Sequence, residues 1–353
     1  MPVSPGLALY SDYAFHSAVA VYLLAMLLHL AEYARARALA VRSLSSSSRV
    51  AVPAGVSAGS TGGAVDGPGS DGPGSDGTVD GAERGTGGPV GGSGSGGSGS
   101  PAGAARPWGE RFGRMAVALT VLGALLHIGS TVVRGLAVER WPWGNMYEFI
   151  SAICLMAVLT WLVMLRRTPA LRAAGAFVLI PVETLLFLAG SALYVRPAPV
   201  VPALQSYWLA IHVTAVSIAS GLLLVAGVGS ILFLVRRAGG HGPLLDLLPS
   251  ADTLDRMAYR ITVFAFPLYT FAVICGAIWA EAAWGRFWGW DPKETVAFVV
   301  WVVYAGYLHA RATAGWRGGA AAWVNVLGMA AMLFNLFFVN LVTTGLHSYA
   351  GLG

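Results

Sequence analysis

Eleven residues between two long apolar stretches carry the densest set of reactive and ligand-binding side chains in this chain. Residues 284–294 read WGRFWGWDPKE, and they contain the aromatic side chains of Trp284, Phe287, Trp288 and Trp290 beside Arg286 and Lys293. Trp284 and Trp288 stand four positions apart, so a helical stretch would place them on one side as a flat aromatic platform. Aromatic rings offer dispersion area and cations bind carboxylates. Such a surface suits a flat, apolar, anionic ligand, and haem fits that description.

The end of the same segment permits a second interpretation. Asp291 followed by Pro292, Lys293 and Glu294 is a typical helix start, with Asp291 as the cap and Glu294 interacting with the helix dipole. Capping does not account for the tryptophans, so we expect Asp291, Lys293 and Glu294 to serve both a helix start and the ligand. Arg286 suits lipid headgroups equally well, and interfacial anchoring remains an alternative for the aromatic residues.

Two histidines lie where they could bind a metal ion beside this segment. His212 is near the start of one apolar stretch, in SYWLAIHV, and His347 follows the last one, in TTGLHSYAG. Two neutral imidazoles can occupy the axial positions of a haem iron. A lone histidine at an interface is more often structural, but two at the same depth beside an aromatic cluster favour a ligand pair.

The remaining histidines and the cysteines differ in setting. His309 follows Glu294 by about 15 residues, which places it roughly 22 Å deeper, and there it could be a ligand on an entry route or an interfacial residue beside Arg311. His29 and His127 are expected to form interhelical hydrogen bonds, and His241 receives no role. Cys154 and Cys275 lie in apolar stretches without a CxxC pair, so neither is expected to be reactive.

The amino-acid composition indicates that the chain lies in a membrane. With 56% apolar and 11% charged residues among 353, it lacks the polar surface of a soluble domain. Spanning helices need about 20 apolar residues each, and the stretches that qualify are 13–34, 113–133, 146–165, 173–194, 207–235, 259–281, 294–313 and 320–343. The net charge of +5 does not indicate nucleic-acid binding, because the arginines form no patch.

The basic residues sort by side instead. Arginines concentrate between spans one and two, three and four, five and six, and seven and eight, whereas the other side has Arg134, Arg140, Arg196, Arg286 and Lys293. The positive-inside rule then places the first group in the cytoplasm. We therefore predict an all-α polytopic membrane bundle of about eight transmembrane helices, with both termini and residues 284–294 extracytoplasmic. The first helix is expected to remain as an anchor, because no cleavable signal peptide is evident.

Residues 43–106 are rich in glycine, serine and proline, and they include GPGSDGPGSDG and GGSGSGGSGS. Such a segment cannot bury enough apolar area to offset the entropy of ordering. The predicted organisation is an extracytoplasmic start and leading helix over 1–34, a disordered cytoplasmic linker over 35–112, and a seven-helix haem-handling domain over 113–353.

The segment WGRFWGWDPKE resembles the tryptophan-rich WWD signature of haem-handling membrane proteins. Its WDPKE ending is most similar to the CcsA/ResC branch of cytochrome c biogenesis, called System II. The resemblance extends over roughly residues 113–353 and includes a GNMYE element at Gly144–Glu148. The leading helix and the linker depart from the pattern without affecting the site residues.

The resemblance implies residue roles, a substrate and partners. It implies that His212 and His347 ligate haem b on the outer face of the plasma membrane, and that His309 belongs to a deeper haem site. Haem would be presented there for thioether attachment to the CxxCH of an apocytochrome c. A ResB-type membrane protein would be the partner in a holocytochrome c synthase complex, with a thioredoxin-like thiol reductant and membrane lipid as further partners. No catalytic nucleophile is assigned.

Other functions remain open from the sequence. A CcmC-type chaperone also carries a WWD signature but hands haem to a separate carrier protein. A small-molecule transporter would use the aromatic cluster only as an anchor, and a purely structural subunit would not need two matched outer histidines.

Overall fold

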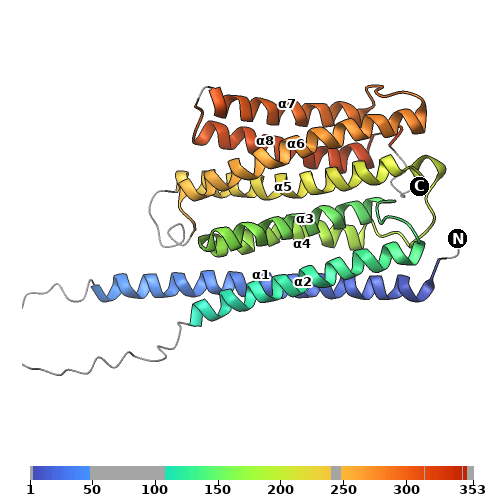
Figure 1. Ribbon diagram of the computed structural model, residues 1–353. Coiled ribbons are helices and arrows are strands. Elements are labelled where there is room, and N and C mark those ends of the chain that lie inside the picture. The colour runs from blue at the N-terminus through green and yellow to red at the C-terminus, as the bar shows by residue number, and fades with distance from the viewer. Residues whose placement is uncertain (1–2, 48–107, 240–247, 314, 344, 348–353) are drawn as a thin grey trace, which may run out of the picture. The chain divides into compact units, whose positions relative to one another are not determined.

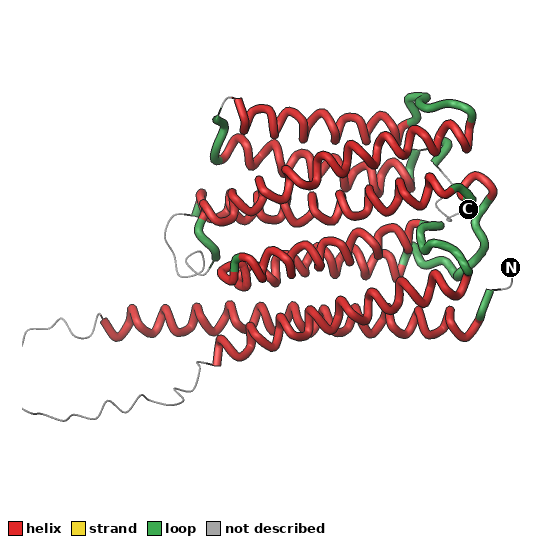
Figure 2. The backbone as a smooth tube through the Cα atoms, in the orientation of Figure 1, coloured by secondary structure: helices red, strands yellow, loops and turns green. Residues whose placement is uncertain are grey.

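The computed structural model describes residues 3–47, 108–239, 248–313, 315–343 and 345–347, and within them every long element is a helix. The helices are α1 (Pro5–Ser47), α2 (Trp108–Val138), α3 (Met146–Arg167), α4 (Gly175–Ser191), α5 (Tyr207–Ala238), α6 (Ala251–Trp284), α7 (Pro292–Thr313) and α8 (Gly319–Leu341), with short 3-10 helices at Pro169–Ala174 and Pro202–Leu204 (Figures 1 and 2). Eight described helices are long and apolar enough to span a membrane, which confirms the predicted fold class. The orientation of the termini stays a prediction.

The helix ends follow local chemistry where the sequence supplies it. Asn145 caps α3 by accepting a hydrogen bond from the backbone N–H of Glu148 at 3.0 Å, and Ser206 caps α5 in the same manner. The first helix begins at Pro5, earlier than the predicted start at 13, because proline is well tolerated in a first helical turn. Of the disordered linker predicted over 35–112, residues 35–47 and 108–112 are instead helical, at the end of α1 and the start of α2. Residues 48–107 and His241 lie outside the described residues.

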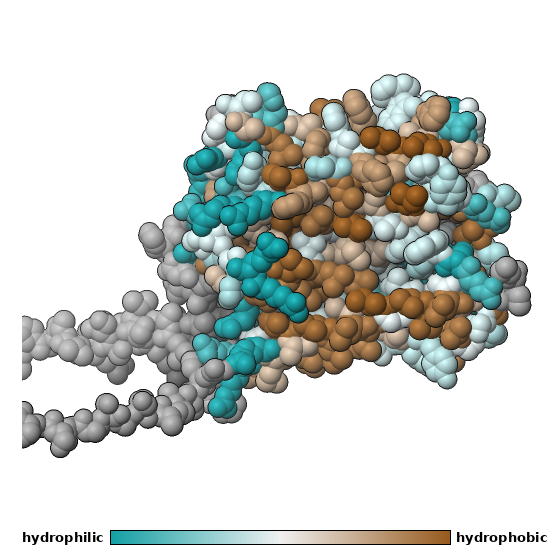
Figure 3. Space-filling view, in the orientation of Figure 1, coloured by the Kyte–Doolittle hydropathy of each residue, from teal (hydrophilic) through white to brown (hydrophobic). Residues whose placement is uncertain are grey.

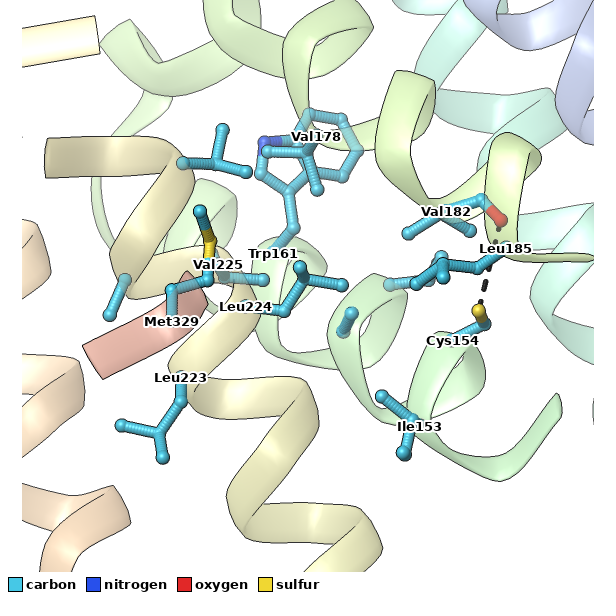
Figure 4. Close-up of a cluster of buried hydrophobic side chains, with 14 of the residues drawn as sticks. Ile153, Cys154, Trp161, Val178, Val182, Leu185, Leu223, Leu224, Val225 and Met329 are labelled. Carbon is cyan, nitrogen blue, oxygen red and sulfur yellow. Dashed lines mark hydrogen bonds between the residues drawn. The ribbon is translucent and has the colours of Figure 1, made fainter. Parts of the chain in front are cut away.

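Helix α5 lies at the centre of the bundle and packs against α3, α6 and α8, while α7 packs against α8. Close approach of α3 and α5 depends on Gly221, since a Cβ there would lie 2.7 Å from the backbone nitrogen of Ala157. The buried core joins α3, α4, α5 and α8; Figure 4 shows Trp161, Val182, Leu224 and Met329 within it.

The leading helix packs on the body of the bundle. Phe15 and Tyr22 of α1 are buried, and Glu32 forms an ion pair with Arg172 at 2.8 Å. Apolar residues form a broad band between two more polar ends of the molecule (Figure 3). A band of this kind is the surface that a bilayer core requires.

Candidate functional site

A large open cavity lies among the ends of α3, α5, α6, α7 and α8 and encloses about 1340 Å³, including space open to solvent. Its lining is mainly apolar and aromatic, with few polar groups, which is the usual character of a site for a large organic ligand. Six of the predicted site residues line it: His212, Phe287, Trp288, Lys293, Glu294 and His347. The tertiary structure thus brings together residues from three separate parts of the chain.

The imidazole of His212 has a fixed orientation. Its Nδ1 lies 2.8 Å from the carbonyl oxygen of Ala272 in α6, and because a carbonyl only accepts, Nδ1 donates. That tautomer leaves the lone pair on Nε2, the arrangement found in most metal-binding histidines. Gly276 permits the close approach, since a Cβ there would lie 2.7 Å from Cε1 of His212.

His347 is held by a carboxylate instead of a carbonyl. Its Nδ1 donates to Oδ2 of Asp291 at 2.9 Å, while Oδ1 of the same carboxylate accepts from the backbone N–H of Leu346 at 2.9 Å. Asp291 also accepts weakly from the N–H of Lys293 at 3.4 Å, so the predicted capping role coexists with positioning of His347. The tautomer again leaves the lone pair on Nε2.

The electrostatic setting keeps the imidazole of His347 neutral. Burial, together with the positive charge of Lys293, lowers the pKa of His347 to about 4, despite the opposing effect of Asp291. Burial acts to raise the pKa of Asp291, but hydrogen bonds from Leu346 and His347 outweigh it and hold that pKa below its usual range. A neutral imidazole beside an ionised carboxylate can bind a metal ion at physiological pH.

The aromatic residues do not form the flat platform expected from a continuous helix. Helix α6 ends at Trp284 because Gly285 adopts the left-handed conformation with φ 71°, so Trp284 and Trp288 are not on one helical face. The ring of Trp284 meets that of His347 edge-on at 5.0 Å, and the ring of Trp288 meets that of Trp290 at 5.8 Å and 89°. Trp290 is 65% exposed and does not line the cavity.

Trp279 is a site residue that the sequence reasoning missed. Its indole stacks on His212 with ring centroids 6.2 Å apart and an angle of 12°, and it contacts His347 edge-on at 5.8 Å. Trp279 therefore contacts both candidate ligands. Its position five residues before Trp284 could have indicated that it belongs to the same aromatic cluster. It lies within the predicted span 259–281, however, where a tryptophan usually indicates helix packing.

The GNMYE element forms part of the cavity wall. Trp143 and Asn145 line the cavity, and the buried Glu148 holds this wall by accepting from the N–H of Gly144 at 2.7 Å. Glu148 is also paired with the side chains of Arg134 and Arg140 at 2.8 and 2.9 Å. Arg134 reaches Asp12 of α1 at 3.6 Å, so the leading helix is connected to this wall.

His309 is not part of the cavity. It is exposed on α7, near the opposite end of that helix from Lys293, as its position in the sequence indicated. His127 donates to or accepts from Ser151 at 2.7 Å between α2 and α3, which confirms its interhelical hydrogen bond. His29 instead packs against the ring of Trp161 and lies 3.8 Å from Glu32 on its own helix. Arg286 is exposed, and its guanidinium group lies over Gly289 outside the cavity.

Comparison with known proteins places the chain among membrane proteins of cytochrome assembly. Residues 143–347 match the cytochrome C assembly protein family. A cytochrome c biogenesis protein CcsA from Parasynechococcus marenigrum is 33% identical over 262 residues, which cover 65% of this chain and 85% of that protein. The CcsA of Gloeobacter violaceus is 32% identical over 298 residues, covering 68% and 86% respectively. The CcsA of Chlamydomonas reinhardtii is 42% identical over 154 residues, but this chain spans only 44% of its length.

The matched region and the length of the shared alignment define a class of multi-pass membrane proteins that handle cytochrome c assembly. The chain belongs to the cytochrome c assembly protein family, and its role lies in cytochrome c maturation. The match includes the cavity, both of its histidines and the whole 284–294 segment. The leading helix α1 precedes it.

Proposed function

We propose that this chain binds haem b as a substrate in the cavity, with His212 and His347 as axial ligands of the iron, and presents it on the outer face of the plasma membrane. The presented haem is then attached to the CxxCH motif of an apocytochrome c. Trp279, Phe287 and Trp288 line the cavity and supply the aromatic surroundings, with Trp284 packed against His347. Asp291 positions His347, while Lys293 and Glu294 form the polar side. The chain acts as a subunit of a holocytochrome c synthase complex.

One observation carries the proposal. The imidazole of His212 in α5 and that of His347, beyond the end of α8, both meet the indole of Trp279. Each donates through Nδ1 to a fixed acceptor, at 2.8 Å for His212 and 2.9 Å for His347. In each ring the tautomer therefore places the lone pair on Nε2, the atom that would bind the iron. The mainly apolar walls fit a porphyrin macrocycle, so the residues present suit the group.

The chemistry of attachment requires little acid or base from this chain. Each thiol of the apocytochrome adds across one vinyl group, so that a C–S bond and a C–H bond form while S–H and the π bond are lost. Nothing leaves, and the addition is neutral in electrons. The chain's residues then have three tasks: they hold the iron, orient the vinyl groups and exclude water from the macrocycle.

The route of haem and the partners follow from the same proposal. Haem enters from the bilayer or cytoplasm near His309, which is exposed on α7 and so reachable from outside the bundle, and then passes to the outer cavity. The distribution of arginines supports an extracytoplasmic cavity. A ResB-type membrane protein completes the complex, and a thioredoxin-like reductant keeps the apocytochrome thiols reduced.

The test is replacement of each ligand with glycine in the full chain, expressed with the ResB-type partner and an apocytochrome c. H212G and H347G are expected to lose the low-spin spectrum of a bis-imidazole haem, and added imidazole should restore both the spectrum and cytochrome maturation in part. Wild-type spectra and normal maturation in both variants would contradict the ligand assignment.

The same experiment separates attachment from transfer to a carrier. The relatives named CcsA favour attachment, which predicts a cytochrome with covalently bound haem when the chain and its partner are present together. Haem that accumulates on a separate carrier without a covalent product would favour the CcmC-type role. Absence of haem from the purified chain would favour transport of another small molecule.

A further inference from the structure

Four polar side chains of the cavity come from α7 and α8, near the start of α7 and in the second half of α8. Lys293 and Glu294 belong to α7, whereas Asn335 and Asn340 belong to α8, and all four line the cavity. The carboxylate of Glu294 is engaged by backbone, accepting from the N–H groups of Gly289 at 2.8 Å and of Asp291 at 3.2 Å. Lys293 is the one lysine or arginine among the described residues that line the cavity.

The ammonium group of Lys293 is held by an amide and not by a carboxylate. Its Nζ donates to Oδ1 of Asn340 at 2.5 Å, and the amide of Asn340 is fixed because its Nδ2 donates to the carbonyl of Leu336 at 2.6 Å. Among the described residues, the ion pairs include none that joins a carboxylate to Lys293. The two oxygens of Asp291 are engaged by Leu346 and His347.

Lys293 is half-buried, and although the charge of Asp291 acts on it from nearby, the described contacts give its ammonium group no touching carboxylate. A charge in an apolar cavity is costly unless it is paired with an opposite charge. An ammonium group has three donors, and the amide oxygen of Asn340 accepts from one of them. The ring of Phe149, 5.9 Å from Nζ, does not neutralise the charge. An anionic group on the ligand would supply both the acceptor and the charge.

We infer that Lys293, held in place by Asn340, binds a propionate carboxylate of haem and so sets which edge of the macrocycle faces α7 and α8. The inference rests on the proposed function, because it assigns a subsite within the same cavity. Asp291 and Lys293 stand two residues apart at the start of α7; the first positions the imidazole of His347 and the second binds the carboxylate. One helix start therefore fixes both the iron ligand and the rotation of the macrocycle about the iron.

The consequence concerns the reacting groups. The vinyl groups of haem b lie away from its propionate edge, so a carboxylate anchored at Lys293 turns at least one vinyl group away from the start of α7. A macrocycle rotated about the iron would present the wrong edge to the apocytochrome thiols. Lys293 is in this account a positioning residue that selects the orientation and favours haem with free carboxylates over esterified haem.

The test compares haem with haem dimethyl ester, whose propionates carry no charge, as ligands of the purified full chain. A charge-assisted hydrogen bond predicts that the wild type binds haem about tenfold more tightly than the ester, or better. In K293M the preference should fall to about one, chiefly through weaker binding of haem, whereas K293R should retain most of it. Arg286, an exposed cation of the same segment outside the cavity, provides the matched control, and R286A should keep the wild-type preference.

Two outcomes would overturn the inference while leaving the proposed function standing. Equal affinity of the wild-type chain for haem and its ester, with a low-spin spectrum for both, would remove the carboxylate subsite while leaving the ligands His212 and His347 in place. An unchanged preference in K293M would do the same. If K293M does not fold, the wild-type comparison still decides. Failure of the wild-type chain to bind either compound would instead contradict the proposed function itself.

Discussion

The carboxylate of Asp291 accepts a hydrogen bond from Nδ1 of His347 at 2.9 Å, although 56 positions separate the two residues in the chain. The same carboxylate packs against Gly345 and accepts from the N–H of Leu346, so it holds the backbone that carries His347 as well as its ring. A residue at the start of a helix thus determines the orientation of a candidate iron ligand.

We expect D291S to separate these two functions. Serine caps helices well, so thermal stability should remain close to that of the wild type, whereas loss of the carboxylate should weaken haem binding about 10- to 100-fold, as for other outer partners of a metal-bound histidine. Haem titration and thermal unfolding of the same preparation provide the measurement. A loss of haem binding in D291S that is accompanied by an equally large loss of thermal stability would instead assign Asp291 to folding alone.

Substitution of Gly276 tests the position of His212 without changing a ligand. A Cβ in G276A would lie 2.7 Å from Cε1 and 2.8 Å from Nδ1 of His212, so the imidazole must move away from the carbonyl of Ala272. Haem spectra should lose His212 ligation, and added imidazole should restore less than in H212G because the displaced ring occupies part of the space. G129A in α2, where a Cβ would meet nothing within 4 Å, is the control; similar spectra for both variants would refute the packing argument.

The tryptophans should differ sharply in their contributions. W279A removes the ring that contacts both histidines, and we expect it to lower haem retention and broaden the spectrum, with W279F intermediate because it keeps part of the ring area. W290A removes a ring that is 65% exposed and outside the cavity. Haem content after purification is the measurement, and a greater loss in W290A than in W279A would restore the idea of an exposed platform.

The low pKa of His347 predicts a wide pH range for ligation. Its folded-state pKa is about 4, below the usual value of about 6.5, so the unfolded chain binds more protons between these values. The contribution of this group to stability is therefore complete above about pH 6.5 and falls as the pH drops toward 4. The low-spin spectrum of the wild type should be constant from about pH 8 to 5.

Imidazole-rescued H347G offers the contrast. Free imidazole titrates close to the usual value of about 6.5, so rescue should weaken as the pH falls below it. Spectra recorded in parallel give the comparison. A wild-type spectrum that changes together with that of the rescued variant would show that His347 is not shielded from protonation.

Labelling of introduced cysteines tests the orientation of the bundle. Ala282 and Ala238 are both exposed, at the cavity end of α6 and at the opposite end of α5. In cells stripped of their wall, A282C should react with an impermeant thiol reagent and A238C should react only after lysis. The native Cys154 and Cys275 are buried and should contribute little background. The reversed pattern would place the cavity in the cytoplasm.

The sequence by itself was sufficient for the membrane class, the number of long helices among the described residues and the identity of six residues that line the cavity. These properties depend on composition and on local runs of residues, which determine how much apolar surface each segment has to bury. The meeting of His212 and His347 at one cavity was also accessible, because His212 lies near the start of one helix and His347 just beyond the end of another, on the same side of an alternating bundle.

The tertiary structure alone decided how these residues meet. Gly285 ends α6 and breaks the expected stacking of Trp284 on Trp288, and Trp279 contacts both histidines instead. The contact of Lys293 with Asn340 spans 47 positions. Such relationships depend on how helices pack side by side and rotate about their axes, and the period of apolar residues within one helix does not determine which side chain of a neighbouring helix lies opposite.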